Sequence, residues 1–138
     1  MPLRPGLLAA YSAAHYVVFG NPELVIRIGE PNPGLDALLE ADGASTAAFV
    51  TAANPRGERR REDENAIAFD SLKAFLNEAR HRRRAGEGRD PQARWAAEPS
   101  FLVLGIPRAE AEALGRRFGQ NAIVFIEKGG APELVVLA

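Results

Sequence analysis

The chain contains no cysteine and only two histidines, His15 and His81. Without thiols it can form no disulfides or thiolate zinc sites, and it has no cysteine nucleophile. Two histidines are too few for a multi-histidine metal centre. We therefore expect neither a metal site nor a cofactor, and the residue types that remain identify no catalytic group.

Long hydrophobic runs and phosphate-binding motifs are also missing. The first sixteen residues, MPLRPGLLAAYSAAHY, are too weakly apolar for a signal peptide and too short to span a bilayer. Neither GxGxxG nor a P-loop occurs. The net charge of -1 provides no field that would steer the protein to DNA or to an anionic membrane. We expect a soluble cytoplasmic protein with no membrane partner.

The length of 138 residues and the apolar fraction of 46% fit one globular domain over residues 1–138. Periodicity and turn residues predict, in the first half of the chain, a short helix at 7–14, two short strands within 16–28, a helix at 35–41 and a strand at 45–51. A helix from Asp63 to about Arg84 and a flexible loop near 85–94 follow. The last predicted elements are a strand at 101–106, a helix at 107–118, and strands at 121–126 and 134–137. Gly129-Gly130 predicts a C-terminal β-hairpin. The fold class is α/β (α+β), with a single mixed β-sheet of about five strands and three helices packed on it.

Asn65 stands out in the long helix predicted after the strand at 45–51. On a helical wheel it shares an arc of roughly 120° with six apolar residues: Phe75, Ala68, Ala79, Leu72, Leu76 and Phe69. An amide facing a core costs about 1–3 kcal/mol unless its hydrogen bonds are made. We therefore predict specific partners for Asn65. It either locks the preceding loop, around the Asn54 backbone, to the helix or points into a polar pocket below that loop.

The loop before this helix begins with Asn54-Pro55-Arg56-Gly57. Asn before Pro is held extended, and Pro-x-Gly favours a turn, so one interpretation is a plain turn. The other follows from position, because a loop between a central strand and a helix is a common ligand site, often for anions. Arg56 would suit an anion, although acidic residues in the same loop largely cancel its field.

Five short pieces in this order and spacing resemble the bacterial family called "domain of unknown function 3293". They are Tyr11-x4-Tyr16, Thr51-Ala-Ala-Asn54-Pro55, Glu64-Asn65, Trp95-x2-Glu98-Pro99-Ser100-Phe101, and Phe118-Gly119-Gln120-Asn121-Ala122-Ile123. The resemblance covers residues 7 to 137. It implies a small single-domain protein without an established activity. The recurring polar positions that it implies are Asn54, Asn65, Glu98 and Gln120, all at the ends of predicted elements.

Glu98 and Gln120 each have a structural and a functional interpretation. Glu98 is either a solvated strand end or a buried carboxyl beside Asn65, whose pKa would rise so that it could act as an acid or base. Gln120 follows the glycine that ends a helix, so it either satisfies the last helical carbonyls or faces a ligand. Trp95 is interpreted as a lid over the flexible loop.

Three hypotheses for function follow. The favoured one is a non-enzymatic binding or regulatory module, holding a polar small molecule or a protein partner at the 54–65 loop, Glu98 and Gln120. The alternative is an enzyme acting on a polar or phosphorylated substrate, with Glu98 or Glu64 as general base and Arg56 as anion clamp. The third is a nucleic-acid accessory protein using the Arg80–Arg94 stretch, although no aromatic residue interleaves the arginine run at 80–84. The sequence does not decide the oligomeric state.

Overall fold

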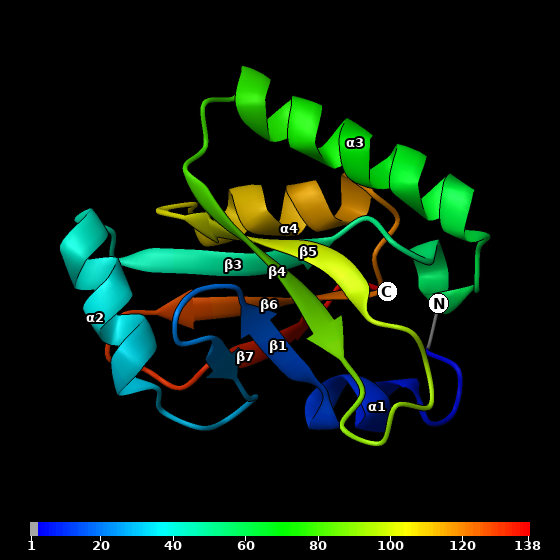
Figure 1. Ribbon diagram of the computed structural model, residues 1–138, viewed down its shortest axis with the longest axis horizontal. Coiled ribbons are helices and arrows are strands. Elements are labelled where there is room, and N and C mark those ends of the chain that lie inside the picture. The colour runs from blue at the N-terminus through cyan, green and yellow to red at the C-terminus, as the bar shows by residue number, and fades with distance from the viewer. Residues whose placement is uncertain (1–2) are drawn as a thin grey trace.

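The computed structural model describes residues 3–138 and shows one seven-stranded sheet, with helices on both of its faces (Figure 1). The strands are β1 (His15–Val18), β2 (Leu24–Ile26), β3 (Thr46–Thr51), β4 (Arg83–Arg89), β5 (Glu98–Leu104), β6 (Ala122–Glu127) and β7 (Glu133–Val136). The helices are α1 (Leu7–Ala13), α2 (Pro33–Asp42), the 3-10 turn η1 (Pro55–Gly57), α3 (Glu62–Glu78) and α4 (Arg108–Arg117). None of the helices between residues 3 and 138 has the length and hydropathy that a membrane crossing requires.

The mixed α/β class and the C-terminal hairpin are confirmed. The mixed sheet of about five strands and the count of three helices are wrong, because residues 3–138 form seven strands and four α-helices. The strand order is β2-β1-β4-β5-β3-β6-β7, and every neighbouring pair is antiparallel. Helices α3 and α4 each connect two strands that run in the same direction, yet a third, oppositely directed strand lies between those two. The helical connections therefore suggested parallel neighbours that the sheet does not contain.

The strand missing from the prediction is β4, and its sequence explains why. RRAGEGR has no alternating apolar residues and contains two glycines, which are depleted in strands. It nevertheless lies inside the sheet, paired with β1 on one side and β5 on the other. Helix α3 correspondingly starts at Glu62 and ends at Glu78, and Arg80 then adopts a left-handed conformation with φ 60°. The prediction of a helix from Asp63 to Arg84 is therefore wrong beyond residue 78.

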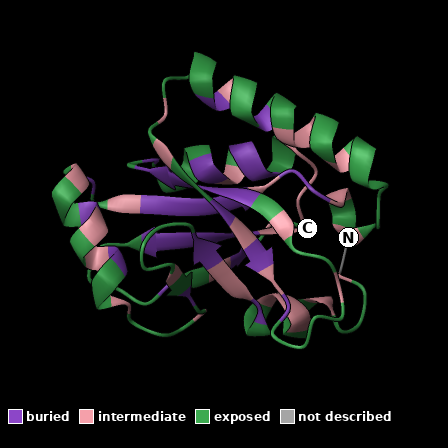
Figure 2. Cartoon of the chain, viewed as in Figure 1, coloured by how far each residue is buried: buried purple, intermediate pink, exposed green. Residues whose placement is uncertain are grey.

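Alternate residues of β3 separate two cores. Ala48 and Val50 point to the face covered by α3 and α4, where they pack with Leu72, Leu76 and Leu114. Ala47 and Phe49 point to the opposite face and pack with Leu35 and Leu39 of α2. Figure 2 shows buried residues concentrated along the central strands, whereas the outer surface of α3 is exposed. The central strands are buried on both faces, as the continuous apolar run at 45–51 indicated.

The face of the sheet that α2 covers is concave. The backbone N–H of Gly29, which follows edge strand β2, donates to the carbonyl of Pro132, which precedes edge strand β7 (2.9 Å). The two edges of the sheet therefore approach each other, and Figure 1 shows β1 and β4 crossing in front of β6 and β7. Helix α2 fills one end of this concavity, and α1 lies across the other end. The space between the two helices contains the pocket described below.

The predicted flexible loop near 85–94 is half strand and half ordered turn. Residues 85–89 belong to β4, and Asp90 organises the residues after it. The buried Asp90 carboxylate accepts hydrogen bonds from the backbone N–H groups of Gln92 (3.1 Å) and Arg94 (2.9 Å) and forms an ion pair with the Arg94 guanidinium (2.9 Å). A carboxylate that accepts two backbone hydrogen bonds fixes a turn as firmly as a helix cap does.

Replacement of Asp90 by asparagine is expected to reduce the loss of stability in acid. The Arg94 guanidinium and the two backbone donors lower the pKa of Asp90 from its ordinary 3.8 to about 2. A pKa lowered by folding stabilises the native state above the unfolded pKa, and that stability is lost as pH falls through the window from about 4 to about 2. Urea unfolding of Asp90→Asn and the native chain over this window tests the prediction. Parallel acid profiles would contradict it.

Candidate functional site

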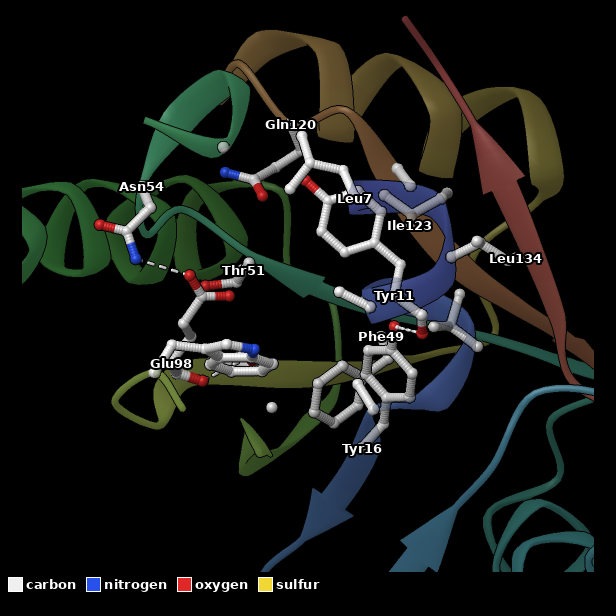
Figure 3. A pocket seen from close by; sticks show the side chains of 18 of the residues that line it. Leu7, Tyr11, Tyr16, Phe49, Thr51, Asn54, Glu98, Gln120, Ile123 and Leu134 are labelled. Atoms are coloured by element: carbon white, nitrogen blue, oxygen red, sulfur yellow. Dashed lines mark hydrogen bonds between the residues drawn. The ribbon is translucent and has the colours of Figure 1, made fainter. Parts of the chain in front are cut away.

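A cavity of about 230 Å³ lies between α1 and the concave face of the sheet (Figure 3). Its lining comes from α1, the loop after β3 and every strand except β2. One end carries polar and indole side chains, namely Asn54, Arg59, Trp95, Glu98 and Gln120. The other end is apolar and is lined by Phe49, Val124 and Leu134. The pocket is therefore divided into a polar end and an apolar end, and Figure 3 shows Asn54 and Leu134 at opposite sides.

Asn65 makes the hydrogen bonds that the helical wheel required. Its Oδ1 accepts from the backbone N–H of Asn54 (2.9 Å), and its Nδ2 donates to Asn54 Oδ1 (3.0 Å). The extended conformation expected for Asn54 before proline is wrong, because Asn54 sits in the left-handed region with φ 46°, which asparagine tolerates better than most residues. Asn65 is absent from the pocket lining. The locking role predicted for it, with the Asn54 backbone as its partner, is confirmed.

Asn54, which Asn65 holds in place, in turn orients Glu98. Its Oδ1 also accepts from the backbone N–H of Arg60 (2.9 Å), which fixes the orientation of the amide. Its Nδ2 consequently points to Glu98 and donates to Oε2 (2.6 Å), as the dashed line in Figure 3 shows. Because Asn54 Oδ1 already accepts twice, only one amide hydrogen of this side chain is left for a ligand. Asn54 is therefore a positioning residue for the Glu98 carboxyl.

The Glu98 carboxyl has one partnered and one unpartnered oxygen. Within residues 3–138, Oε1 has no hydrogen-bond partner. The one side-chain polar atom of these residues that is sealed from solvent without a hydrogen bond is Asp42 Oδ2, which forms an ion pair with Arg82 instead. Glu98 Oε1 is therefore still reachable. Burial raises the pKa of Glu98, and the hydrogen bond from Asn54 opposes that rise. Tyr16 lines the same pocket, and burial raises its pKa with a further contribution from the charge of Glu98.

Replacement of Glu98 by glutamine is expected to raise the melting temperature at neutral pH. Glutamine retains an oxygen for the Asn54 amide and removes the cost of burying a charge. A carboxyl whose pKa is raised by folding binds more protons in the native state, so its native chain loses stability as pH rises above the unfolded pKa of 4.5. The gain from Glu98→Gln should therefore vanish in acid and grow towards neutrality. Thermal unfolding at several pH values measures it, and a pH-independent difference would contradict the assignment.

The structural interpretation of Gln120 is confirmed, and its role towards a ligand stays a prediction. Its Nε2 donates to the carbonyls of Phe118 (3.2 Å) and Ala53 (3.2 Å), so it satisfies a helix-end carbonyl and ties α4 to the loop after β3. The glycine before it, Gly119, has φ 69° as the helix stop predicted. Gln120 also lines the pocket, and within the described residues its Oε1 has no partner.

The sequence predicted helix α1 but not that this helix closes one side of the pocket. Tyr11 of this helix lines the cavity, and its hydroxyl accepts from Asn121 Nδ2 (3.2 Å) while its carbonyl accepts from the Tyr16 hydroxyl (2.5 Å). The Arg4 side chain adds a hydrogen bond to the carbonyl of Gly57. The available signal was the Tyr11-x4-Tyr16 spacing, which marked the two rings without showing what they enclose.

The structure brings together Asn54, Glu98 and Gln120 but places Arg56 outside the pocket. Arg56 is exposed, and its backbone N–H, with φ 59° at that residue, donates to the carbonyl of Gly119 (2.7 Å). Arg59 lines the cavity in its place. Glu64 is also elsewhere, because its carboxylate accepts from the backbone N–H of Arg61 at the start of α3 (3.1 Å).

The Arg80–Arg94 stretch is more neutralised than its sequence indicates. Arg82 forms an ion pair with Asp42 (3.0 Å), Arg89 with Glu23 (3.0 Å) and Glu87, and Arg94 with Asp90. Paired arginines contribute less to a field that attracts phosphates. A nucleic-acid role for this stretch stays a prediction, which retention on heparin at low salt would test.

Comparison with known proteins gives one match. A family model described as "Protein of unknown function (DUF3293)" matches residues 50–123. No curated protein and no solved structure matches the chain. The matched range contains the loop after β3, Asn65, Glu98 and Gln120, whereas α1 and Tyr16 lie before it.

Proposed function

The chain belongs to the DUF3293 family of proteins of unknown function, and on that premise we propose that it is a non-enzymatic binding module for a small molecule with a polar head and an apolar body. The polar head occupies the end of the pocket at Glu98 and Gln120, and the apolar body occupies the end at Phe49 and Leu134. The bacterial and cytoplasmic setting expected from the sequence stays a prediction.

The half-partnered carboxyl of Glu98 is the observation that carries this proposal. If the group served only to hold Asn54, a glutamine would make the same hydrogen bond without a buried charge. The protein instead has a carboxyl with a raised pKa at the polar end of an otherwise apolar cavity. The hydrogen bonds of Asn54 and Asn65 fix the orientation of that carboxyl. Convergent polar groups in a largely apolar pocket are the usual signature of a small-molecule site.

The raised pKa of Glu98 also favours the alternative, an enzyme with Glu98 as general base. Glu64, the other base suggested by the sequence, caps α3 and does not line the pocket. Turnover of a ligand identified by binding distinguishes the two functions. The binding proposal predicts that the bound molecule is recovered unchanged after prolonged incubation with the protein.

Gly88 and Trp95 make the proposal testable. Trp95 is the single tryptophan and lines the pocket, so its fluorescence reports occupancy. Gly88 is buried and lines the pocket, and a Cβ added there would meet nothing within 4 Å. Leucine at position 88 is therefore expected to fill the cavity without loss of stability.

A thermal-shift screen of polar metabolites, with Trp95 fluorescence as a second readout, is expected to return ligands that stabilise the native chain. A ligand at 100 times its dissociation constant adds about 2.7 kcal/mol. Gly88→Leu should abolish the response, whereas Ala85→Leu, on the same strand but outside this pocket, should retain it. A ligand that stabilises Gly88→Leu as strongly as the native chain would place binding elsewhere.

A further inference from the structure

We propose that the ligand of this pocket is a small zwitterion with an apolar body, of which an aliphatic α-amino acid is the type. Its ammonium group binds between Glu98 and Gln120, and its carboxylate binds Arg59. This assignment rests on the proposed binding function and adds the chemical class of the ligand.

Two hydrogen-bond acceptors are left over at the polar end, beside donors of Arg59, Trp95 and Asn54 that also have no partner among the described residues. Glu98 Oε1 and Gln120 Oε1 have no partners among the described residues, while the amide hydrogens of Gln120 are both directed to backbone carbonyls. Figure 3 shows the two side chains at the same end of the pocket, with Asn54 beside them. Two acceptors, one of them a carboxylate, match a group that carries several N–H donors and a positive charge. A primary ammonium is the smallest such group.

Arg59 supplies the opposite charge. Four arginines occur in the loop after β3, and Arg59 is the one that lines the pocket. Its neighbours Arg60 and Arg61 form ion pairs with Glu58 (3.7 Å) and Asp63 (3.2 Å). Within residues 3–138, Arg59 has no ion pair and no side-chain hydrogen bond, so its guanidinium is available for bidentate binding of a carboxylate.

The size and charge of the site narrow the chemical class of the ligand further. A cavity of about 230 Å³ is below the usual range for drug-sized ligands, roughly 300–1,000 Å³, and excludes a dinucleotide. The apolar end, lined by Phe49, Val124 and Leu134, suits a branched aliphatic or aromatic side chain. One carboxyl and one guanidinium at the other end complement a ligand with no net charge and two opposite charges.

Calorimetric titration with L-leucine and two analogues tests the class. Isoamylamine lacks only the carboxylate, and 4-methylpentanoate lacks only the ammonium. L-Leucine is expected to bind tightest. Loss of the ammonium should weaken binding roughly tenfold or more, since a hydrogen bond to a buried charge is lost. Loss of the carboxylate should weaken binding about two- to fivefold, since Arg59 is exposed.

Titration of the same three ligands into protein variants tests which side chain binds each charged group. Glu98→Gln should weaken L-leucine roughly tenfold and leave 4-methylpentanoate unaffected or improved. Arg59→Gln should make L-leucine and isoamylamine bind equally, whereas Arg60→Gln should behave as the native chain. Tighter binding of isoamylamine or 4-methylpentanoate than of L-leucine would overturn the zwitterion.

The outcomes also separate this inference from the function on which it rests. If L-leucine and its analogues fail to bind but the metabolite screen returns other ligands that Gly88→Leu excludes, the zwitterion is overturned and the binding function stands. If neither the series nor the screen gives a pocket ligand, both are overturned.

Discussion

Replacing Asn54 with alanine is expected to lower the free energy of unfolding by about 2–4 kcal/mol. The side chain makes three hydrogen bonds, to Arg60 N–H, Asn65 Nδ2 and Glu98 Oε2. A net hydrogen bond contributes about 1 kcal/mol, and a partner left buried and unsatisfied costs more. The backbone adds a further penalty, because φ 46° is unfavourable for alanine by about 1–2 kcal/mol. Urea denaturation measures the change.

Asn54→Gly separates the two causes. Glycine loses the same three hydrogen bonds but adopts positive φ freely, so it should be about 1 kcal/mol more stable than Asn54→Ala. Asn77→Ala is the matched control, because Asn77 is exposed on α3 and bonds only to the Arg83 side chain; it should cost less than about 0.5 kcal/mol.

A double-mutant cycle with Asn65→Ala tests the link between the loop and the helix. The two side chains share the hydrogen bond from Asn65 Nδ2 to Asn54 Oδ1, so their substitutions should be non-additive by about 1 kcal/mol. Strict additivity would show that the two residues act separately, and the positioning of Glu98 through this pair would have no support.

Asn65 and its partner could be predicted because the signal is local. A single polar residue on an otherwise apolar helical arc requires hydrogen bonds wherever the helix packs, and the preceding loop is the nearest source of them. The end of α4 at Gly119 and the C-terminal hairpin were predictable for the same reason, since each depends on a few adjacent residues.

Arg59 could not be predicted over Arg56, because the choice depends on backbone geometry that the residues do not reveal. Asn54, Arg56 and Gly57 all have positive φ, and these three left-handed residues decide which arginine faces the cavity. Gly57 and Asn54 are residue types that tolerate such a conformation, whereas nothing in the sequence marks Arg56 for it. Helix α1 was placed by tertiary contacts, since none of its residues is buried and its pattern shows no core-facing side.

Strand β4 was not predicted, because its position in the sheet requires glycine, a residue without a side chain, at Gly86. Gly86 is buried between β1 and β5, and an added Cβ would lie 2.0 Å from the carbonyl oxygen of Val17. The backbone of β1 thus occupies the place of a side chain, and that close approach helps the sheet to curl around the pocket. Strands are predicted from the side chains that they pack, whereas β4 fits into the sheet because Gly86 has no side chain.

Gly86→Ala is therefore expected to cost about 3 kcal/mol or more, a large share of the 5–15 kcal/mol that stabilises a typical domain. The atom in the way belongs to the backbone, so relief requires β1 to move away from β4, and Tyr16 would move with it. Gly88→Ala, two residues along the same strand, has open space and should unfold as the native chain does. Chemical denaturation compares the two variants. Equal stability would mean that β1 does not lie against Gly86, and the concave wall behind Glu98 and Tyr16 would then need a different origin.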